Sequence, residues 1–296
     1  MPRDAASGTE DLAVPVHSGR RRGILSLGSR GLLYAALLVG AGVMLFPFVW
    51  MVSTSLTSDG QLFVTPPQLI PSPVQPDNYG RVADLYPILT FLRNSLLVAL
   101  VSTSFQVLSS AMAAYAFARL RFRGADGLFL VYLATLMVPL PVIIAPLFIE
   151  MRYLGLINSY PGLILPGVAS AFGTFLLRQA FLTLPRELEE AAFVDGASHW
   201  TVFWRIVMPL SKPALATFGI FAFMASWNSF LWPLVITNSL DMMTLPVGLS
   251  NLQGQYTTAW NLVMAGSTIS VIPILFVYLA AQRYVIQGFA TSGIKG

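Results

Sequence analysis

Six apolar stretches constrain the fold of this chain more than any other feature of its sequence. Each is about 20 residues long, the length that an α-helix needs to cross the hydrocarbon core of a bilayer. They lie at residues 31–52, 94–117, 127–149, 160–178, 214–236 and 260–282. Only 10% of the 296 residues are charged, against about 25% in soluble domains. We therefore predict an all-α integral membrane protein with six transmembrane helices in a lipid bilayer.

The basic residues predict which ends of these spans face the cytoplasm. With the N-terminus inside, 14 of the 17 Lys and Arg residues fall on the cytoplasmic side, and only Arg81, Arg93 and Arg152 fall outside. Basic residues accumulate in cytoplasmic loops. We therefore expect a multi-pass protein of the cytoplasmic (inner) membrane with both termini inside. The net charge of +4 reflects this topology, and we expect no nucleic-acid partner.

Both ends of the chain are expected to lie outside the membrane domain. Residues 1–30 are polar and rich in Arg, without an apolar helical period, so we predict a disordered cytoplasmic arm. The alternative is a signal peptide, but the apolar stretch that follows is longer than a signal core and no small-residue cleavage site follows it. The transmembrane domain then covers residues 31–283, and residues 284–296 form a cytoplasmic tail.

Prolines interrupt two regions of this domain. Residues 55–93 form the longest external segment, where five prolines within eleven residues forbid a regular helix. This segment fits equally a cap that touches an external partner or a stiff linker. The third span contains Pro139, Pro141 and Pro146, so its backbone must bend or break. Such a break could build part of a substrate path or be a simple packing kink.

The most polar internal segment runs from Pro185 to Pro213, between the fourth and fifth spans. Pro185 suits a first helical position. Glu187, Glu189 and Glu190 then place negative charge in the first turns, where the helix dipole favours it. We therefore expect a short helix to begin at the start of this polar segment (residues 185–213).

A second helix should follow a glycine corner in the polar segment. Gly196 offers a left-handed C-terminal cap, and Ser198 is a good N-cap. Apolar residues then recur at i, i+3, i+4, i+7 and i+8, namely Trp200, Phe203, Trp204, Val207 and Met208. The pattern predicts a helix, a corner and an amphipathic helix whose apolar side faces the membrane domain.

These residues carry a resemblance to a known family. The spacing E-A-A-x3-G-x9-I-x-L-P, with Met208 in place of the usual Leu, is reproduced by Glu190, Ala191, Ala192, Gly196, Ile206 and Pro209. It is the cytoplasmic signature of the membrane subunits of ABC importers. NSLLVAL near residue 94, GLINSYPGLILP near residue 155 and a tail ending in SGIKG are similar to the maltose-type (MalG-like) permeases of the carbohydrate class.

The resemblance implies a fold, a set of partners and a role for the polar segment. The implied fold is the type I ABC importer permease fold. The partners are a second homologous permease, ABC ATPase subunits that bind ATP and Mg, and an extracytoplasmic solute-binding protein. The residues implied to couple the chain to the ATPase are Glu190, Ala191, Ala192, Asp195, Gly196, Trp200, Ile206 and Pro209. An ordinary amphipathic loop lying on the lipid surface is the alternative.

We expect a transport subunit without an ATPase site, a metal or a cofactor of its own. A P-loop needs Gly-Lys followed by Ser or Thr, whereas neither Lys212 nor Lys295 follows a glycine. The only histidines, His17 and His199, lie far apart in sequence, and cysteine is absent. Metal binding and Ser-His hydrolysis therefore have no candidate set of residues.

An ion-coupled secondary transporter is the rival class of function. Ion coupling commonly uses Asp, Glu or His inside the membrane, where such residues are expensive. All 13 carboxylates of this chain fall in loops, at span edges or in a terminal segment. Their placement favours a path that is driven by a partner ATPase.

Uncharged polar and aromatic residues within the spans are candidates for the path of a carbohydrate. Sugar hydroxyls need donors and acceptors, and the apolar face of the ring lies on aromatic carbons. The candidates are Asn94, Gln106, Trp227, Asn228 and Trp232. For the last three, an interfacial aromatic belt or helix–helix hydrogen bonding is the alternative.

The alternative cargo is glycerol 3-phosphate or a glycerophosphodiester. A phosphate prefers a basic group in its path. Only Arg93 stands near a span edge outside the cytoplasmic loops, so the sequence favours a neutral sugar.

Overall fold

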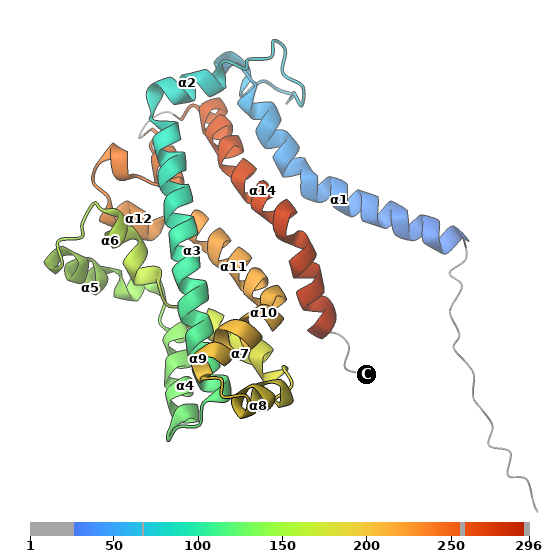
Figure 1. Cartoon of the computed structure of the whole chain (residues 1–296). Coiled ribbons are helices and arrows are strands. Elements are labelled where there is room, and N and C mark those ends of the chain that lie inside the picture. Colours follow the sequence, from blue (N-terminus) through green and yellow to red (C-terminus); the bar gives the residue numbers. More distant parts are fainter. Residues whose placement is uncertain (1–26, 67, 255–257, 293–296) are drawn as a thin grey trace, which may run out of the picture. The chain divides into compact units, whose positions relative to one another are not determined.

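The computed structural model describes residues 27–66, 68–254 and 258–292 (Figure 1). Within these ranges the regular structure is helical, apart from one isolated bridge between Gln253 and Thr258. The predicted arm at residues 1–30 falls almost wholly outside the described residues. Of the predicted tail, residues 284–292 continue the last helix.

The helices follow one another along the chain, and the longest connection between them, residues 56–77, joins α1 to α2. Their bounds are α1 (Leu27–Ser55), α2 (Asn78–Leu85), α3 (Ile88–Arg119), α4 (Ala125–Ala134), α5 (Leu140–Tyr153), α6 (Tyr160–Ile164), α7 (Ala171–Leu182), α8 (Glu187–Val194), α9 (His199–Val202), α10 (Met208–Leu210), α11 (Lys212–Trp227), α12 (Leu231–Ile236), α13 (Leu245–Ser250) and α14 (Trp260–Ser292). Short 3-10 turns lie at η1 (Asp59–Gln61), η2 (Thr135–Met137), η3 (Leu165–Gly167) and η5 (Leu240–Met242), and η4 (Phe203–Val207) is a π-helix.

The chain divides into two compact units, residues 1–47 and residues 48–296. The division falls within α1, at Pro47. In the first unit, residues 31–47 form an apolar helix whose side chains are all exposed. The second unit contains the other helices, and every site considered below lies within it.

The described residues contain three helices that are long and apolar enough to cross a membrane alone: Gly31–Ser55, Ile88–Arg119 and Trp260–Ala280. The number rises to as many as six if each of three sharply bent helix pairs counts as one span. The chain is therefore a membrane-embedded protein, and the predicted all-α membrane fold is confirmed with three to six candidate spans.

Prolines break the third apolar segment, as expected. Ala125–Met137 and Leu140–Tyr153 meet at 99°. Pro139 is the N-cap of α5 and Pro141 lies in its first turn, where a missing amide hydrogen costs little. In the fourth segment the two helical parts, α6 with η3 and α7, are bent by 48°.

The fifth apolar segment, residues 214–236, is not the continuous span that the sequence predicted. α11 ends at Trp227 and α12 begins at Leu231. In a continuing helix, Pro233 could not donate to the carbonyl of Ser229, and its ring would clash with that carbonyl. The break leaves Asn228 at the end of a helix.

The second unit packs around α3, whose most extensive contacts are with α7 and α11 (Figure 1). Small residues that the sequence places every fourth position on α3, Ser110, Ala114 and Ala118, are buried and let neighbouring helices approach closely. α7 and α11 also pack closely. The ring of Phe218 on α11 occupies the space in which a Cβ at Gly173 on α7 would lie, so only glycine fits there.

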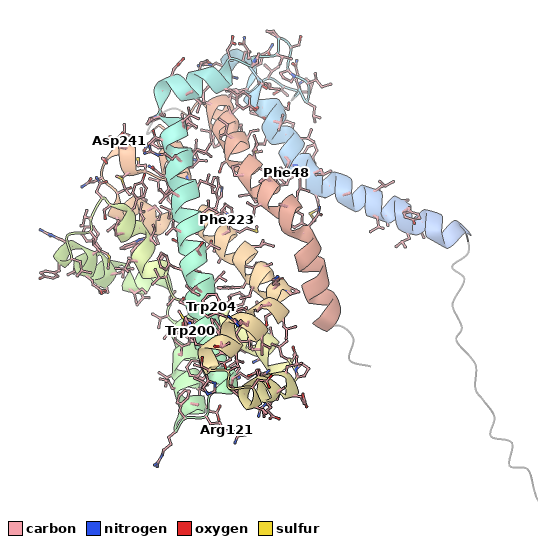
Figure 2. All side chains as sticks on the ribbon, in the orientation of Figure 1. Phe48, Arg121, Trp200, Trp204, Phe223 and Asp241 are labelled. Carbon is pink, nitrogen blue, oxygen red and sulfur yellow. The ribbon has the colours of Figure 1, made fainter. Side chains whose placement is uncertain are left out.

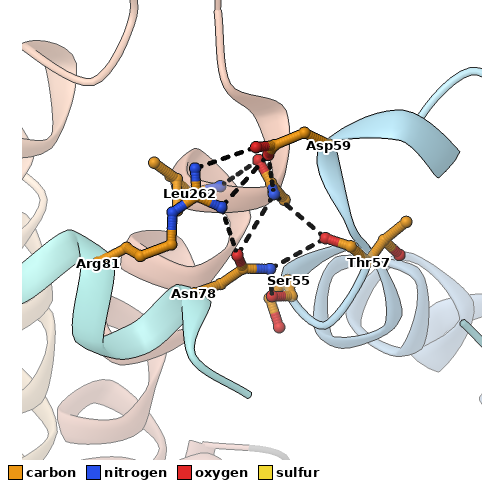
Figure 3. A network of polar contacts seen from close by, with 7 residues as sticks. Ser55, Thr57, Asp59, Asn78, Arg81 and Leu262 are labelled. Atoms are coloured by element: carbon orange, nitrogen blue, oxygen red, sulfur yellow. Dashed lines mark hydrogen bonds and ion pairs between the residues drawn. The ribbon is translucent and has the colours of Figure 1, made fainter. Parts of the chain in front are cut away.

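A polar network holds the start of the proline-rich segment (Figure 3). Asn261, at the start of α14, is fully buried, and its amide nitrogen donates to the Thr57 carbonyl at 3.1 Å and to the Asp59 carboxylate at 2.6 Å. Arg81 on α2 forms an ion pair with Asp59 at 3.1 Å. The segment is therefore tied to both α2 and α14 at its beginning.

This network lowers the pKa of the Asp59 carboxyl. The hydrogen bond from Arg81, and then that from Asn261, hold the pKa of Asp59 below its usual value of 3.8. A carboxyl whose pKa is lowered by folding stabilises the folded state at neutral pH, and that contribution is lost only as the pH falls through the lowered value. The network is therefore intact across the physiological pH range.

Candidate functional site

The predicted corner of the polar segment forms at Gly196, whose φ of +84° lies in the left-handed region. The Gly196 N–H donates to the Phe193 carbonyl at 3.0 Å, and the Ala197 N–H donates to the Ala192 carbonyl at 2.9 Å. These are the two bonds of a Schellman cap. The glycine thus ends α8 and redirects the chain, as the sequence predicted.

The two helix starts follow local signals, with one correction. α8 begins at Glu187 with acidic residues in its first turn, as predicted, but its N-cap is Arg186. Pro185 therefore precedes the helix and is not its first residue. Ser198 caps α9 as expected, because its hydroxyl accepts from the Thr201 N–H at 3.2 Å.

The second helix of the polar segment departs from the predicted amphipathic pattern. Its middle part, Phe203–Val207, is a π-helix, in which hydrogen bonds join residues i and i+5. The 3.6-residue period used for the prediction therefore does not define one face here. Phe203 and Val207 are buried, whereas Trp200 is 61% exposed and Trp204 is 40% exposed (Figure 2). The two tryptophans do not hold this helix against the rest of the chain.

A buried ion pair fixes the polar segment to α3. The Arg119 Nε atom lies 2.7 Å from Glu189 Oε1, with side chains only 4% and 8% exposed. Arg119 Nη2 also donates to the carbonyls of Phe181 at 2.7 Å and Leu184 at 2.8 Å. One guanidinium therefore joins the last residue of α3 to the end of α7 and to α8.

Sequence reasoning missed this pair. It treated Arg119 as one basic residue among several near the end of a span, and Glu189 only as a charge that suits a helix dipole. Burial raises the pKa of Glu189, and the nearby Arg119 charge opposes that rise. Charges removed from water need close partners and further hydrogen bonds, which the two carbonyls supply to Arg119.

Tyr115 provides a second contact between α3 and the polar segment, one helical turn before Arg119. Its hydroxyl lies 3.3 Å from His199 Nδ1, and its ring packs at a tilt against Phe203, with centroids 5.4 Å apart. His199 in turn contacts the ring of Phe193 on α8 edge-on, at 4.8 Å. α3 thus touches both helices that flank the glycine corner.

The exposed surface of the polar segment carries both apolar and acidic side chains. The exposed apolar side chains include Val194, which is 88% exposed, with Leu188, Phe193, Trp200 and Trp204. Of the predicted coupling residues, those that are exposed are Glu190, Ala191, Asp195, Gly196, Trp200 and Pro209, while Ala192 and Ile206 are partly buried. Such a surface outside the apolar segments fits a protein partner.

The predicted aromatic cluster of the substrate path does not assemble. Trp227 is buried against Phe223 and donates through Nε1 to the Ser270 carbonyl at 3.2 Å. Trp232 belongs to a different apolar cluster and donates to the Gly162 carbonyl at 3.0 Å. Both indoles therefore serve helix packing, which corrects the prediction that they form one site with Asn228.

Asn94 is also committed to the interior. It is fully buried, and its amide nitrogen donates to the carbonyls of Asp241 at 2.7 Å and Met243 at 2.9 Å. Its amide oxygen accepts from the Tyr160 hydroxyl at 2.7 Å. The Asn94 amide is therefore bonded within the chain at both its nitrogen and its oxygen, whereas Gln106, further along α3, is half-buried.

Asn228 lines an open hollow of about 520 Å³ beside the break between α11 and α12. Its Nδ2 atom and its backbone N–H both donate to the Met224 carbonyl in the last turn of α11, at 2.8 and 3.1 Å. The other lining residues are Phe230, Pro246, Leu249, Ser250, Gln253, Val263, Ser267, Ser270, Val271 and Ile274. The lining carries no charge and combines amides and hydroxyls with apolar side chains.

Comparison with known families identifies this arrangement. Residues 106–291 match the family described as binding-protein-dependent transport system inner membrane component. The chain belongs to this family. The match includes the polar segment, the hollow and the part of α3 that contacts the polar segment.

Relatives and a solved structure agree with the family. The arabinooligosaccharides transport system permease protein AraQ of Halalkalibacterium halodurans is 36% identical, over 86% of this chain and 93% of the relative. The sn-glycerol-3-phosphate transport system permease protein UgpE of Yersinia pestis is 38% identical, over 86% and 94%. A bacterial ABC transporter that imports the polysaccharide alginate has a chain with a TM-score of 0.76 and 26% identity, covering 88% of this chain and 98% of that one.

The family settles the class of protein. The chain has the predicted type I ABC importer permease fold and is a transport subunit of a binding-protein-dependent ABC importer. The ion-coupled alternative is thereby excluded. Among the described residues, no group of three or more His, Asp or Glu side chains could hold a metal ion.

The Arg119–Glu189 pair predicts a specific pattern of stability. Arg119→Met should lower the free energy of unfolding by about 3–5 kcal/mol, because it leaves a buried carboxylate without its counter-charge. The double variant with Glu189→Met should lose less than the two single variants together. Thermal unfolding of the purified protein in detergent measures this, with the exposed Arg121→Met as control.

The same variant should respond to pH. Removal of the Arg119 charge, which opposes the effect of burial, should raise the pKa of Glu189 further. A buried carboxyl whose pKa is raised by folding destabilises the folded state while it is ionised, and this cost falls as the pH drops through the raised pKa and the carboxyl takes up a proton. The deficit of Arg119→Met should therefore shrink from pH 8 to pH 5. A deficit that stays constant with pH would show that the lost packing of Arg119, rather than the unpaired carboxylate, causes the effect.

Proposed function

We propose that this chain is one of two permease subunits of an importer that moves a carbohydrate into the cell, driven by ATPase subunits that bind the polar segment. ATP and Mg are bound by those ATPase subunits, and a solute-binding protein delivers the substrate from outside. The observation that carries the proposal is the exposed apolar and acidic surface of the polar segment, held rigidly to α3 by Arg119 and Tyr115.

The orientation follows from the charges. We place the polar segment, the end of α3 at Arg119 and both termini in the cytoplasm of a cell whose inner membrane holds the chain, because this arrangement puts 14 of 17 basic residues inside. The turn η5 and the network around Asp59 then face outward.

A cysteine at Val194 tests this orientation. The parent chain has no cysteine, and Val194 is 88% exposed. In intact cells that lack the ATPase subunits, so that the polar segment is uncovered, Val194→Cys should react with a membrane-permeant maleimide and stay protected from an impermeant one. Phe63→Cys, at a side chain that is 80% exposed and is placed on the outer side, should react with both reagents. Labelling of Val194→Cys by the impermeant reagent would overturn the proposed topology.

The polar segment should bind the ATPase through its corner. Gly196→Val strains a left-handed residue by roughly 1–2 kcal/mol, and it should release the ATPase without unfolding the membrane helices. Glu190→Ala should weaken the same contact by removing a charge from its edge. Co-purification of the ATPase and its stimulation by loaded binding protein measure both effects.

Two matched controls separate docking from strain. Gly124 has nearly the same φ, +81°, and a Cβ there also meets open space, so Gly124→Val strains the backbone equally in another loop. Glu187→Ala removes another exposed acid of α8. Full ATPase retention and stimulation in both Gly196→Val and Glu190→Ala would refute the coupling role.

The hollow at Asn228 supports a neutral substrate. The lining offers amides and hydroxyls without any basic side chain, which suits sugar hydroxyls better than a phosphate. One relative is named for arabinooligosaccharides and another for sn-glycerol-3-phosphate. We therefore infer that the hollow lines the transport path and that an uncharged sugar or oligosaccharide passes it. Glycerol 3-phosphate is the second candidate, because UgpE is named for it.

Substitution in the hollow should affect transport selectively. Asn228→Leu or Gln253→Leu removes one hydrogen-bonding group worth about 0.5–1.5 kcal/mol, so the apparent KM for uptake should rise about two- to tenfold. ATPase retention should not change. Asn238→Leu, at an exposed position outside the hollow, is the control. Unchanged KM in both variants, or uptake of glycerol 3-phosphate in preference to sugars, would refute this assignment.

A further inference from the structure

α3 is the least interrupted of the long apolar helices in the described part of the chain. It runs for 32 residues without a proline or a glycine, which corresponds to about 48 Å. The other two long helices contain prolines, Pro47 in α1 and Pro273 in α14. The remaining apolar segments are broken, as at the 99° bend before α5. α3 therefore lacks the prolines, glycines and breaks at which helices mainly bend.

The outward end of α3 is bonded to the loop between α12 and α13. Asn94 donates to the carbonyls of Asp241 and Met243 at 2.7 and 2.9 Å. The neighbouring Ser95 hydroxyl accepts from the Leu245 N–H at 2.7 Å. Both side chains are almost completely buried, so these bonds do not compete with water. The outer loop (residues 240–245) is therefore fixed to α3 over its length.

The inward end of α3 is bonded to the polar segment. Tyr115 contacts His199 and Phe203, and Arg119 pairs with Glu189. Figure 2 shows Asp241 of the outer loop and Trp200 of the polar segment near opposite ends of α3. Asn94 and Arg119 are 25 residues apart, or about 37 Å along a helix.

We propose that α3 is a strut that links the polar segment to the outer loop, with Asn94 as a positioning residue for transport. The strut converts a displacement of the polar segment by the ATPase into a displacement of residues 240–245 on the outer side. This proposal rests on the proposed coupling function of the polar segment. It predicts that the position of the outer loop changes when the ATPase subunits bind or hydrolyse nucleotide.

A strut makes a distinctive prediction, because its two ends act in series. If either end is released, displacement no longer reaches the other side, and release of the second end adds nothing. Two residues that merely stabilise their own surroundings at this distance would instead have independent, additive effects. Combining variants at the two ends therefore separates transmission from local stability.

The reporter is a single cysteine in the outer loop. Leu240 is 46% exposed, and the parent chain has no cysteine. In the purified importer, with its partner permease, ATPase and binding protein, we would measure the rate at which a maleimide labels Leu240→Cys, with and without ATP plus vanadate. The labelling rate should change on trapping the ATPase. No change would overturn the proposal.

Asn94→Ala releases the outer end. The inner variant, Arg119→Met made together with Glu189→Met, removes the ion pair that fixes the inner end without leaving an unpaired buried charge. Each should diminish the nucleotide-dependent change in labelling, and the combination of the outer and inner variants should show no greater loss than the stronger of the two. Ser104→Ala is the control, because the Ser104 hydroxyl bonds only within its own helix, to the Leu100 carbonyl. If Asn94→Ala fails to fold, Ser95→Ala, which removes one acceptor, takes its place.

Two results would refute the strut: an unchanged response in Asn94→Ala or Ser95→Ala, or independent effects that multiply when the outer and inner variants are combined. Retention of the ATPase distinguishes this failure from failure of the coupling role. If Gly196→Val and Glu190→Ala keep the ATPase fully bound and stimulated, the coupling role fails. If those variants lose it while Asn94→Ala responds like the parent, only the strut fails.

Discussion

The buried Arg119–Glu189 pair is the interaction on which the geometry of the polar segment depends. Neither charge can be removed from water cheaply, so each needs its partner at hydrogen-bonding distance. At 2.7 Å the pair requires the end of α3 and the start of α8 to meet. Because Arg119 also binds the carbonyls of Phe181, in the last turn of α7, and of Leu184, in the turn after it, one side chain fixes the direction in which the chain continues into α8.

Features that depend on near neighbours in sequence were predictable. Gly196 caps α8, Ser198 starts α9 and Pro139 breaks the third apolar segment, as expected. Each effect arises from the residue's own dihedral preference or from a bond to a group three or four residues away. Such effects depend mainly on nearby residues, so they can be read from one sequence more often than contacts with distant partners.

Features that depend on distant partners were not predictable in this way. Trp227 and Trp232 are five residues apart, but the helix break between them sends each indole to a different carbonyl, on Ser270 and on Gly162. Glu189 finds its partner 70 residues earlier in the chain. Periodicity also failed where the helix is not α-helical, because in the π-helix at Phe203–Val207 the 3.6-residue period no longer places Trp204 on the buried face with Phe203 and Val207.

The contrast between broken and unbroken helices has a physical basis in the bilayer. A helix break frees backbone groups that lipid cannot satisfy, so it is tolerated only beside polar partners or a water-filled space. At the break after Trp227, the Ser229 N–H donates to the Ser226 carbonyl at 3.2 Å, and the open hollow lies alongside. α3 has no such break, and its polar side chains at Asn94 and Arg119 instead bind carbonyls of other segments. The break between α11 and α12 thus adjoins the uncharged hollow, whereas the continuous α3 is bonded to other segments near both of its ends.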